Sequence, residues 1–238
     1  MNRLPLHQDL YLIAHDQAGK LLTHQSSLAL GLAGAALLDV ILAGRLTLSA
    51  GRVTGGPAGS ALPAGSALPD GTGAIADDLI ALTARDGDTG PETGVGRETG
   101  AGRGVGAGVL LKRAAADGIN DRTREELLAS GVLVRVSGRR MGMLPYTRYQ
   151  LADIASVVRA SSGVRSAVEG WKAPDARCAG LCGLVAVLRL EAELYLDRPA
   201  SRLVGHLREI AATATPPVGE LVEIVDTLVA EAAVAVYR

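Results

Sequence analysis

The chain has 238 residues, 48% of them hydrophobic, and a formal net charge of -1. That apolar content suffices for a packed core and excludes an intrinsically disordered protein, while the near-neutral charge argues against a protein that coats nucleic acid. Residues 112–172 nevertheless hold 11 Lys and Arg against 6 Asp and Glu, so an anionic partner is expected to meet the middle of the chain.

The first expected elements are two helices. Residues 4–16, LPLHQDLYLIAHD, place their apolar side chains on one helical face. Residues 28–46, LALGLAGAALLDVILAGRL, are the most apolar stretch, and their leucines recur at three- and four-residue spacing. The uninterrupted apolar run ends at Asp39, short of the ~20 residues that cross a bilayer. The stretch therefore predicts a buried central helix that ends at Gly44, in preference to a membrane span.

A small hairpin is expected around Ser49–Gly51, after which the composition changes. Glycine, proline, serine and threonine then dominate, and AGSALP occurs twice in tandem. Such sequence buries too little apolar surface to offset the entropy of ordering it. Residues 54–73 and 86–108 are therefore expected to form a disordered glycine-rich insertion within a single domain spanning 1–238, interrupted by a short helix over 74–84.

The rest of the chain predicts further helices and a second hairpin. Alternation over 131–144 indicates the hairpin, with its turn at Ser137–Gly138. A long helix is expected behind Asp175, with an apolar stripe that reaches Tyr195. Helical periodicity also predicts helices over 110–117, 121–130, 151–160, 164–171, 201–212 and 218–237. The expected fold class is mainly α: a central apolar helix in a helix bundle, surrounded by amphipathic helices, with one or two small β-hairpins.

Basic residues gather in the helix over 121–130 and in the hairpin that follows: Arg122, Arg124, Arg135, Arg139, Arg140 and Arg148. Apolar residues lie beside them: Val134, Val136, Met141, Met143 and Leu144. Basic residues near an anionic bilayer gain about 1 kcal/mol each, and apolar residues at a hairpin tip add burial in the interface. The pattern indicates a lipid-headgroup surface, and an ordinary solvated basic face with a hairpin buried in a subunit contact explains it equally well.

Two other classes of binding protein compete with this hypothesis. The helices over 110–117 and 121–130 and the basic hairpin have the order of a winged helix that binds DNA. Against that reading, Asp121, Glu125 and Glu126 lie on the would-be recognition helix and would face phosphates. A scaffold that acts through protein contacts is the third alternative.

Catalysis, metals and cofactors are not expected. Acidic residues are scattered, and no serine or cysteine lies in a recognisable nucleophile motif. Cys178 and Cys182 lack the second pair of ligands that a zinc site needs. The N-terminus has no basic segment followed by an apolar one, so a cytosolic protein is expected.

Several segments, taken in order, resemble the Golgi phosphoprotein 3 family, which has members in actinobacteria. They are LPLHQDLYLIA, the apolar helix ending in GRL, REELLASGVL with the hairpin and MLPYTRY, and PDARCAGLCGL. The resemblance implies a mostly helical fold with a hairpin used in self-association. Its eukaryotic members are non-enzymatic peripheral membrane adaptors that bind phosphatidylinositol 4-phosphate and retain glycosyltransferases.

The family's headgroup site uses a tryptophan and arginines, and the aligned positions in this chain are His24, Ala33, Asp117 and Asn120. Arginine holds a phosphate as a bidentate fork, whereas alanine offers no donor and aspartate repels the anion. The expected protein is a peripheral membrane adaptor on the cytoplasmic side. It would bind anionic phospholipid or phosphoinositide headgroups through the six arginines, with altered specificity, and form homo-oligomers through the hairpin. A nucleic-acid partner is not expected.

Overall fold

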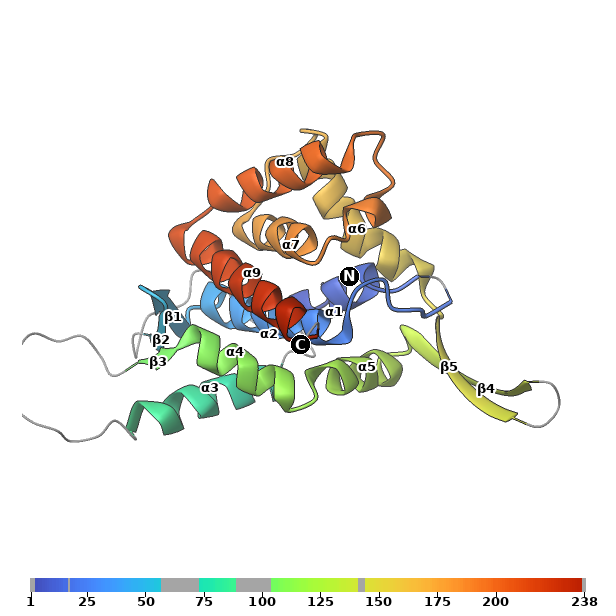
Figure 1. Cartoon of the computed structure of the whole chain (residues 1–238), viewed down its shortest axis with the longest axis horizontal. Helices are drawn as coiled ribbons and strands as arrows, with labels where there is room; N and C mark the ends of the chain where they lie inside the picture. The colour runs from blue at the N-terminus through green and yellow to red at the C-terminus, as the bar shows by residue number, and fades with distance from the viewer. Residues whose placement is uncertain (1–2, 17, 57–72, 89–103, 141–143, 237–238) are drawn as a thin grey trace, which may run out of the picture.

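The computed structural model describes residues 3–16, 18–56, 73–88, 104–140 and 144–236, without the side chains of 86–88, 138–140, 144–146 and 236. The described part is mostly helical and contains two small antiparallel sheets. One helix, α2 (Gln25–Leu42), lies at the centre, and the other helices pack around it (Figure 1). The predicted fold class is confirmed.

The helix α2 is the core helix because its side chains are almost all apolar, so every face of it gains from being covered. All its residues from Ser27 to Ile41 are buried. It is long and apolar enough to cross a membrane, yet 83% of it is buried inside the protein. The predicted core helix is confirmed, and Gly44, at a φ of 71°, follows its end as expected.

Small residues let neighbouring helices approach α2 closely. A Cβ added at Gly34 would lie 2.7 Å from Cγ2 of Val225, and one added at Gly180 would clash with Leu38. Glycine at these positions therefore sets the spacing between helices. The helices that make these contacts or lie beside them on α2 are α1 (Leu6–Ile13), α7 (Ala176–Val187) and α9 (Pro216–Val236).

The first sheet contains three strands: β1 (Leu46–Ser49), β2 (Arg52–Gly55) and β3 (Val105–Gly106). Ala50 and Gly51, both at positive φ, form the turn of the predicted hairpin between β1 and β2. The third strand was not predicted. Val105 pairs with Val53, and both side chains are buried, so the sheet gains apolar contacts that local composition does not reveal.

Residues at both edges of the expected insertion belong to regular secondary structure. Residues 54–56 belong to or follow β2, residues 86–88 continue α3 (Gly73–Asp88), and residues 104–108 form β3 and the start of α4 (Ala107–Ala116). The helix predicted over 74–84 is confirmed as part of α3. The remainder of the predicted insertion, 57–72 and 89–103, lies outside the described residues.

The helices α3, α4 and α5 (Ile119–Ala129) lie on one side of α2, and the second hairpin projects beyond α5 (Figure 1). Its strands are β4 (Leu133–Arg140) and β5 (Leu144–Leu151). The predicted turn at Ser137–Gly138 is wrong, because both residues pair with β5. Leu133 and Leu151 face each other at the foot of the hairpin against the core, and this apolar pair places the turn farther out.

On the other side of α2 lie α6 (Ile154–Val168), α7 and α8 (Ala200–Ala212). The two helices predicted over 151–160 and 164–171 are one helix, α6. The hydroxyls of Ser161 and Ser162 donate to carbonyls of the preceding turn, so these residues stay inside the helix.

The prediction of one long helix behind Asp175, with an apolar stripe that reaches Tyr195, is also wrong. The helix α7 ends at Val187, Arg189 takes a positive φ of 58°, and a 3₁₀ turn, η1 (Glu191–Leu194), precedes an exposed Tyr195.

Candidate functional site

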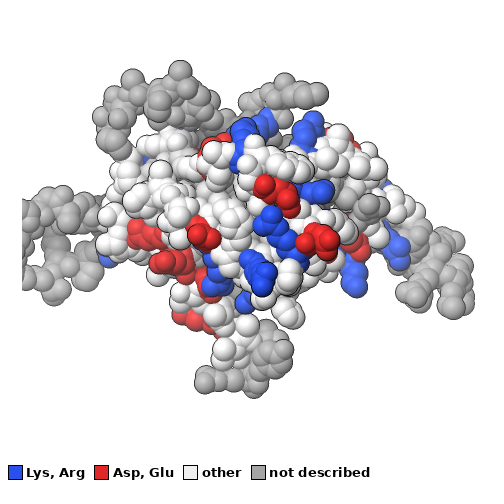
Figure 2. All heavy atoms as spheres, turned by 90° about the horizontal axis from the view of Figure 1, so that it is seen from above, with Lys and Arg blue, Asp and Glu red and all other residues white. Residues whose placement is uncertain are grey.

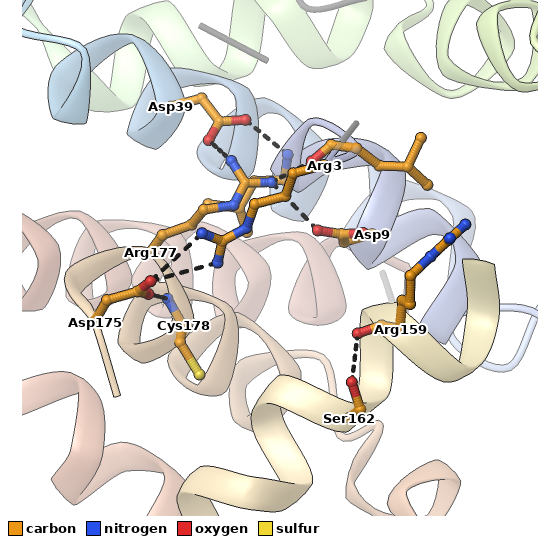
Figure 3. Close-up of polar contacts among 10 residues, drawn as sticks. Arg3, Asp9, Asp39, Arg159, Ser162, Asp175, Arg177 and Cys178 are labelled. Atoms are coloured by element: carbon orange, nitrogen blue, oxygen red, sulfur yellow. Dashed lines mark hydrogen bonds and ion pairs between the residues drawn. The ribbon is translucent and has the colours of Figure 1, made fainter. Parts of the chain in front are cut away.

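Two features of the described residues qualify as candidate sites. The first is the basic surface predicted from the sequence, on α5 and the β4–β5 hairpin. The second is a cluster of charged residues between α1, α2 and α7, beside a small cavity (Figure 3). The sequence predicted only the first.

The two arginines of α5 are held by neighbouring side chains. Arg122 lies 2.5 Å from Asp78 of α3, and Arg124 lies 2.7 Å from Asp121 one turn earlier in α5. The guanidinium of Arg124 also stacks over the ring of Tyr149 in β5, 4.6 Å from its centre. These contacts fix both arginines, and they compete with any headgroup for the same donors.

The arginines of the hairpin lie farther out. Arg135 and Arg148 are both exposed, and their partners across the ladder are Tyr149 and Val136. Because successive residues of a strand face opposite sides, Arg135 and Arg148 lie on opposite faces of the hairpin. Val134 is exposed and Val136 is half-buried on the same face as Arg148. The remaining predicted positions, the side chains of Arg139, Arg140 and Leu144 with residues Met141 and Met143, lie outside the described residues.

The foot of the hairpin is held by the body of the protein. A Cβ added at Gly19 would clash with the carbonyl oxygen of Tyr149, so the loop after α1 lies directly against β5. Together with the Arg124 contact, this fixes the direction in which the hairpin leaves α5.

The four positions aligned with the family's headgroup site contain no arginine, and the structure shows what each does. Ala33 is fully buried within α2. His24 precedes the first turn of α2, Asp117 follows the last turn of α4, and Asn120 donates from Nδ2 to the carbonyl of Gln25 at 3.2 Å. These residues bring the α4–α5 turn against the start of α2 without supplying a guanidinium donor.

The second candidate site centres on Arg177 of α7. Its guanidinium donates to Asp39 of α2, to Asp9 of α1 at 3.2 Å and to the carbonyl of Leu4 at 2.5 Å (Figure 3). Asp39 also accepts from the backbone N–H of Leu6 at 2.6 Å. Arg177 and both carboxylates are largely buried. The cluster therefore joins three helices and fixes the start of α1.

Burial raises the pKa of Asp9 to about 6, because desolvation of the carboxylate outweighs the attraction of Arg177. Burial also raises the pKa of Asp39, again against the attraction of Arg177. Acidic residues with a raised pKa beside a buried arginine occur at functional sites. They also occur in structural ion-pair networks, so the raised pKa values alone do not distinguish the two.

The cavity beside this cluster has a volume of about 100 Å³. Its polar lining comes from Arg3, Asp9, Ser156 and Arg159, with the thiol of Cys178. Arg3 pairs with Asp175 at 3.4 Å and Arg159 with Asp153 at 3.2 Å, so the arginines at its rim are already balanced by carboxylates. The arrangement is that of a structural ion-pair network, because no excess positive charge remains to hold an anionic ligand.

The two thiols of α7 differ in their pKa. A hydrogen bond from Cys182 lowers the pKa of Cys178, and the same bond together with burial raises that of Cys182. Neither thiol has the base and orienting group of a nucleophilic site among its described contacts. Within the described residues, no cluster of three or more His, Cys, Asp or Glu could hold a metal ion.

Away from these features the surface charge is mixed. Figure 2, which views the molecule from the side where α8 lies, shows basic and acidic residues interleaved. Ion pairs such as Arg208 with Asp226, at 2.9 Å, account for part of that pattern. Among the described residues of this face, the picture shows no extended basic patch that would compete with the hairpin for an anionic partner.

Comparison with known proteins agrees with the order of elements. The family model described as Golgi phosphoprotein 3 (GPP34) matches residues 6–233, which includes α1, both hairpins and most of α9. A search of the curated proteins finds no match. Because the family model covers nearly the whole chain, this protein belongs to the Golgi phosphoprotein 3 family.

Proposed function

We propose that this protein is a non-enzymatic peripheral membrane adaptor that binds anionic lipid headgroups through the β4–β5 hairpin. The observation that carries the proposal is the charge of that hairpin: residues 133–151 contain four arginines and no acidic residue. The hairpin projects from the body (Figure 1), so its charges meet a flat anionic surface ahead of most of the molecule. The family is generally one of non-catalytic adaptors, which supports the proposal.

The energy of such binding comes mainly from the hairpin. A basic residue close to an anionic bilayer contributes about 1 kcal/mol. Arg135 is exposed on the hairpin and contributes up to this amount, whereas Arg122 and Arg124 contribute less because Asp78 and Asp121 already neutralise them. Arg139 and Arg140 add charge in the same strand. The protein would act at the cytoplasmic face of the membrane, where anionic lipids are exposed.

In this proposal, binding depends on the negative charge of the headgroup more than on its chemical structure. Selective binding of a phosphoinositide requires donors arranged around the ring phosphate, and guanidinium groups supply them in pairs. Ala33 has no donor, and Asp117 places a negative charge at the end of α4. Vesicles that contain phosphatidylinositol 4-phosphate and vesicles that contain phosphatidylglycerol, matched for surface charge, should therefore bind the protein about equally.

Vesicle co-sedimentation tests the proposal. The wild-type protein should sediment with phosphatidylglycerol vesicles at low salt and lose affinity as salt rises, since screening weakens the attraction. The double variant Arg135→Ala/Arg148→Ala removes two of the four arginines of the hairpin and should weaken binding by up to about 2 kcal/mol, at most roughly 30-fold in affinity.

The matched control is Arg202→Ala/Arg208→Ala, which removes two exposed arginines from α8, on the opposite side of α2 from α5. It should bind vesicles as the wild type does. No sedimentation of the wild type at low salt, or equal losses in the two double variants, would exclude the hairpin as the membrane surface.

The structure gives the winged-helix alternative little support. α4, α5 and the hairpin follow one another as that motif requires, but Asp121 and Glu125 of α5 are exposed and Arg122 and Arg124 are paired with acids. A recognition helix with exposed carboxylates repels the phosphates that it must approach. Binding to duplex DNA, with none to anionic vesicles, would favour that alternative.

A further inference from the structure

The solvent face of α6 and the residues that follow it carry an unusual set of side chains. Of the seven large apolar residues that are well exposed in the described part of the chain, four fall within residues 133–172. They are Val134 at 41%, Ile154 at 67%, Val158 at 58% and Trp171 at 77% exposure. Soluble surfaces rarely gather large apolar side chains in one segment without a partner.

Two of these residues, Ile154 and Val158, share one side of one helix. Ile154 and Val158 are separated by four positions in α6, so they lie one turn apart on the same face. Arg165 falls on that face two further turns along, and it is exposed. The opposite face of α6, with Ala160 and Val164, is buried against the core. α6 thus has a buried apolar face, as an amphipathic helix does. Unlike most amphipathic helices, it also carries large apolar residues on its solvent face.

Trp171 has a fixed place at the end of the same helix. Gly170 takes a left-handed φ of 74°, and the N–H of Trp171 donates to the carbonyl of Ser166 at 2.9 Å. This closure turns the chain back over the last turn of α6, so Trp171 stays beside the helix. Its indole is nevertheless the most exposed large apolar group of this segment. Tryptophan favours the boundary between headgroups and acyl chains, where one end of its ring is apolar and the other is wet.

The charge of the segment indicates what covers this face. Residues 133–172 contain seven Lys and Arg against two acidic residues. Both acids are engaged: Asp153 with Arg159 at 3.2 Å, and Glu169 with Arg198 at 3.6 Å. Arg165 and Lys172 are exposed, and the ion pairs of the described residues involve neither of them. Positive charge beside exposed aliphatic side chains and an interfacial tryptophan complements an anionic bilayer.

The position of α6 supports the same partner. It begins three residues after β5, at the foot of the basic hairpin, and runs away from the hairpin along the edge of the molecule to the region of α8 (Figure 1). The N–H of Ala152 donates to the carbonyl of Val132, which joins the start of this segment to the foot of β4. The start of the exposed face of α6 therefore adjoins the proposed membrane surface.

We infer that the solvent face of α6, formed by Ile154, Val158 and Arg165 and extended by Trp171 and Lys172, lies on the anionic bilayer beside the hairpin. The inference rests on the proposed function and adds to it a second, apolar contact. The hairpin draws the protein to the membrane by charge. The α6 face then enters the headgroup region, with Trp171 at the acyl boundary and its helix parallel to the surface.

Trp171 makes the inference directly measurable, because it is the only tryptophan of the chain. Its emission should shift to shorter wavelength when phosphatidylglycerol vesicles are added, and lipids brominated on the acyl chains should quench it. Vesicles of phosphatidylcholine alone should produce neither change. Because the indole is exposed in the free protein, the change of environment should be large.

A variant experiment separates the apolar contact from the charge. Ile154→Ser/Val158→Ser should lower vesicle affinity roughly tenfold or more, since each side chain loses the gain from leaving water. The matched control, Val109→Ser/Val234→Ser, replaces two exposed valines of α4 and α9 and should leave the affinity unchanged. Equal far-ultraviolet circular dichroism of both variants shows that each folds.

The outcomes are distinguishable. Sedimentation with vesicles without any change in Trp171 emission overturns the inference and leaves the proposed function standing. Failure to sediment at all overturns both. An emission shift that grows with protein concentration in the absence of vesicles shows that the face joins copies of the chain, and this also overturns the inference.

Discussion

At the residue scale, Arg177 and its two carboxylates hold the start of the chain in place. Asp9 and Asp39 would each be costly to bury alone, and Arg177 is the cation that both of them contact. In the sequence, Arg177 lies in the first turn of the helix expected behind Asp175, and Asp39 ends an apolar run. Neither position indicated an ion pair, because the partners lie 138 positions apart along the chain.

The raised pKa of Asp9 predicts a pH dependence of stability. Burial raises the pKa of Asp9 to about 6 in the folded protein, whereas the pKa of an unperturbed aspartate is 3.8. The folded state therefore holds more protons between these values, and the free energy of unfolding falls as pH rises through this window. Asp9→Asn keeps an acceptor for Arg177 and should flatten that slope, with a change of up to about 3 kcal/mol across the window.

Urea unfolding at a series of pH values measures this effect. Asp226→Asn removes a carboxylate exposed on α9 and is the control, which should keep the wild-type slope. A wild-type stability that rises with pH through the same window, and loses that rise in Asp9→Asn, would show that Arg177 stabilises the carboxylate more than burial opposes it.

At the element scale, glycines decide how closely the helices pack. Gly183 of α7 faces α8 and α9: a Cβ added there would lie 2.7 Å from Cγ2 of Val222 and 2.9 Å from Cβ of Ala211. Neither neighbour can rotate away, since Cβ of Ala211 is fixed to its backbone and Val222 is β-branched. The sequence showed that these helices contain small residues, but only the packing shows which of them are required.

Two glycine substitutions test this account. Gly183→Ala should destabilise the protein by about 1–3 kcal/mol through overpacking, despite the better helix propensity of alanine. Gly205→Ala in α8 is the matched control. Nothing lies within 4 Å of its added Cβ, so it should stabilise the protein by about 0.5–1 kcal/mol. Thermal unfolding followed by circular dichroism measures both, and a stabilised Gly183→Ala would show that α7, α8 and α9 can move apart at little cost.

At the scale of the whole molecule, the β4–β5 hairpin stands apart from an otherwise compact body (Figure 1). It forms a two-stranded sheet in the described part of the chain, so both strands have an outer edge with unpaired backbone groups. Such edges pair readily with another strand. This property supports the proposal that the protein self-associates through the hairpin, with the exposed Val134 at the contact.

Sedimentation velocity over a range of protein concentrations measures that association. The wild type should form oligomers as concentration rises, and Val134→Asp/Val136→Asp should remain monomeric at the same concentrations, because like charges oppose the contact. Val109→Asp, which adds a charge at an exposed position of α4, should associate as the wild type does. A wild type that stays monomeric throughout would contradict self-association through the hairpin.

The sequence alone determined the features that depend on neighbours along the chain. The apolar period of α2, the alternation of the hairpins and the clustering of arginine over 122–148 are local patterns, and they indicated the mainly α fold and the basic surface. Predictions from local composition failed where other contacts in the folded chain determine the structure. β3 forms because Val105 meets Val53, and α6 passes through Ser161–Gly163 because its hydroxyls bond within the helix.

Only the tertiary structure decided which arginines can bind an external anion and which are already paired with a carboxylate of the protein. Arg122 and Arg124 appear in the sequence as members of one basic cluster with Arg135, yet folding pairs them with Asp78 and Asp121. Folding also exposes Ile154 and Val158 on α6 and Trp171 just after its end. The reason is physical: periodicity along a chain fixes which residues share a face of a helix, whereas packing fixes whether that face meets protein or solvent.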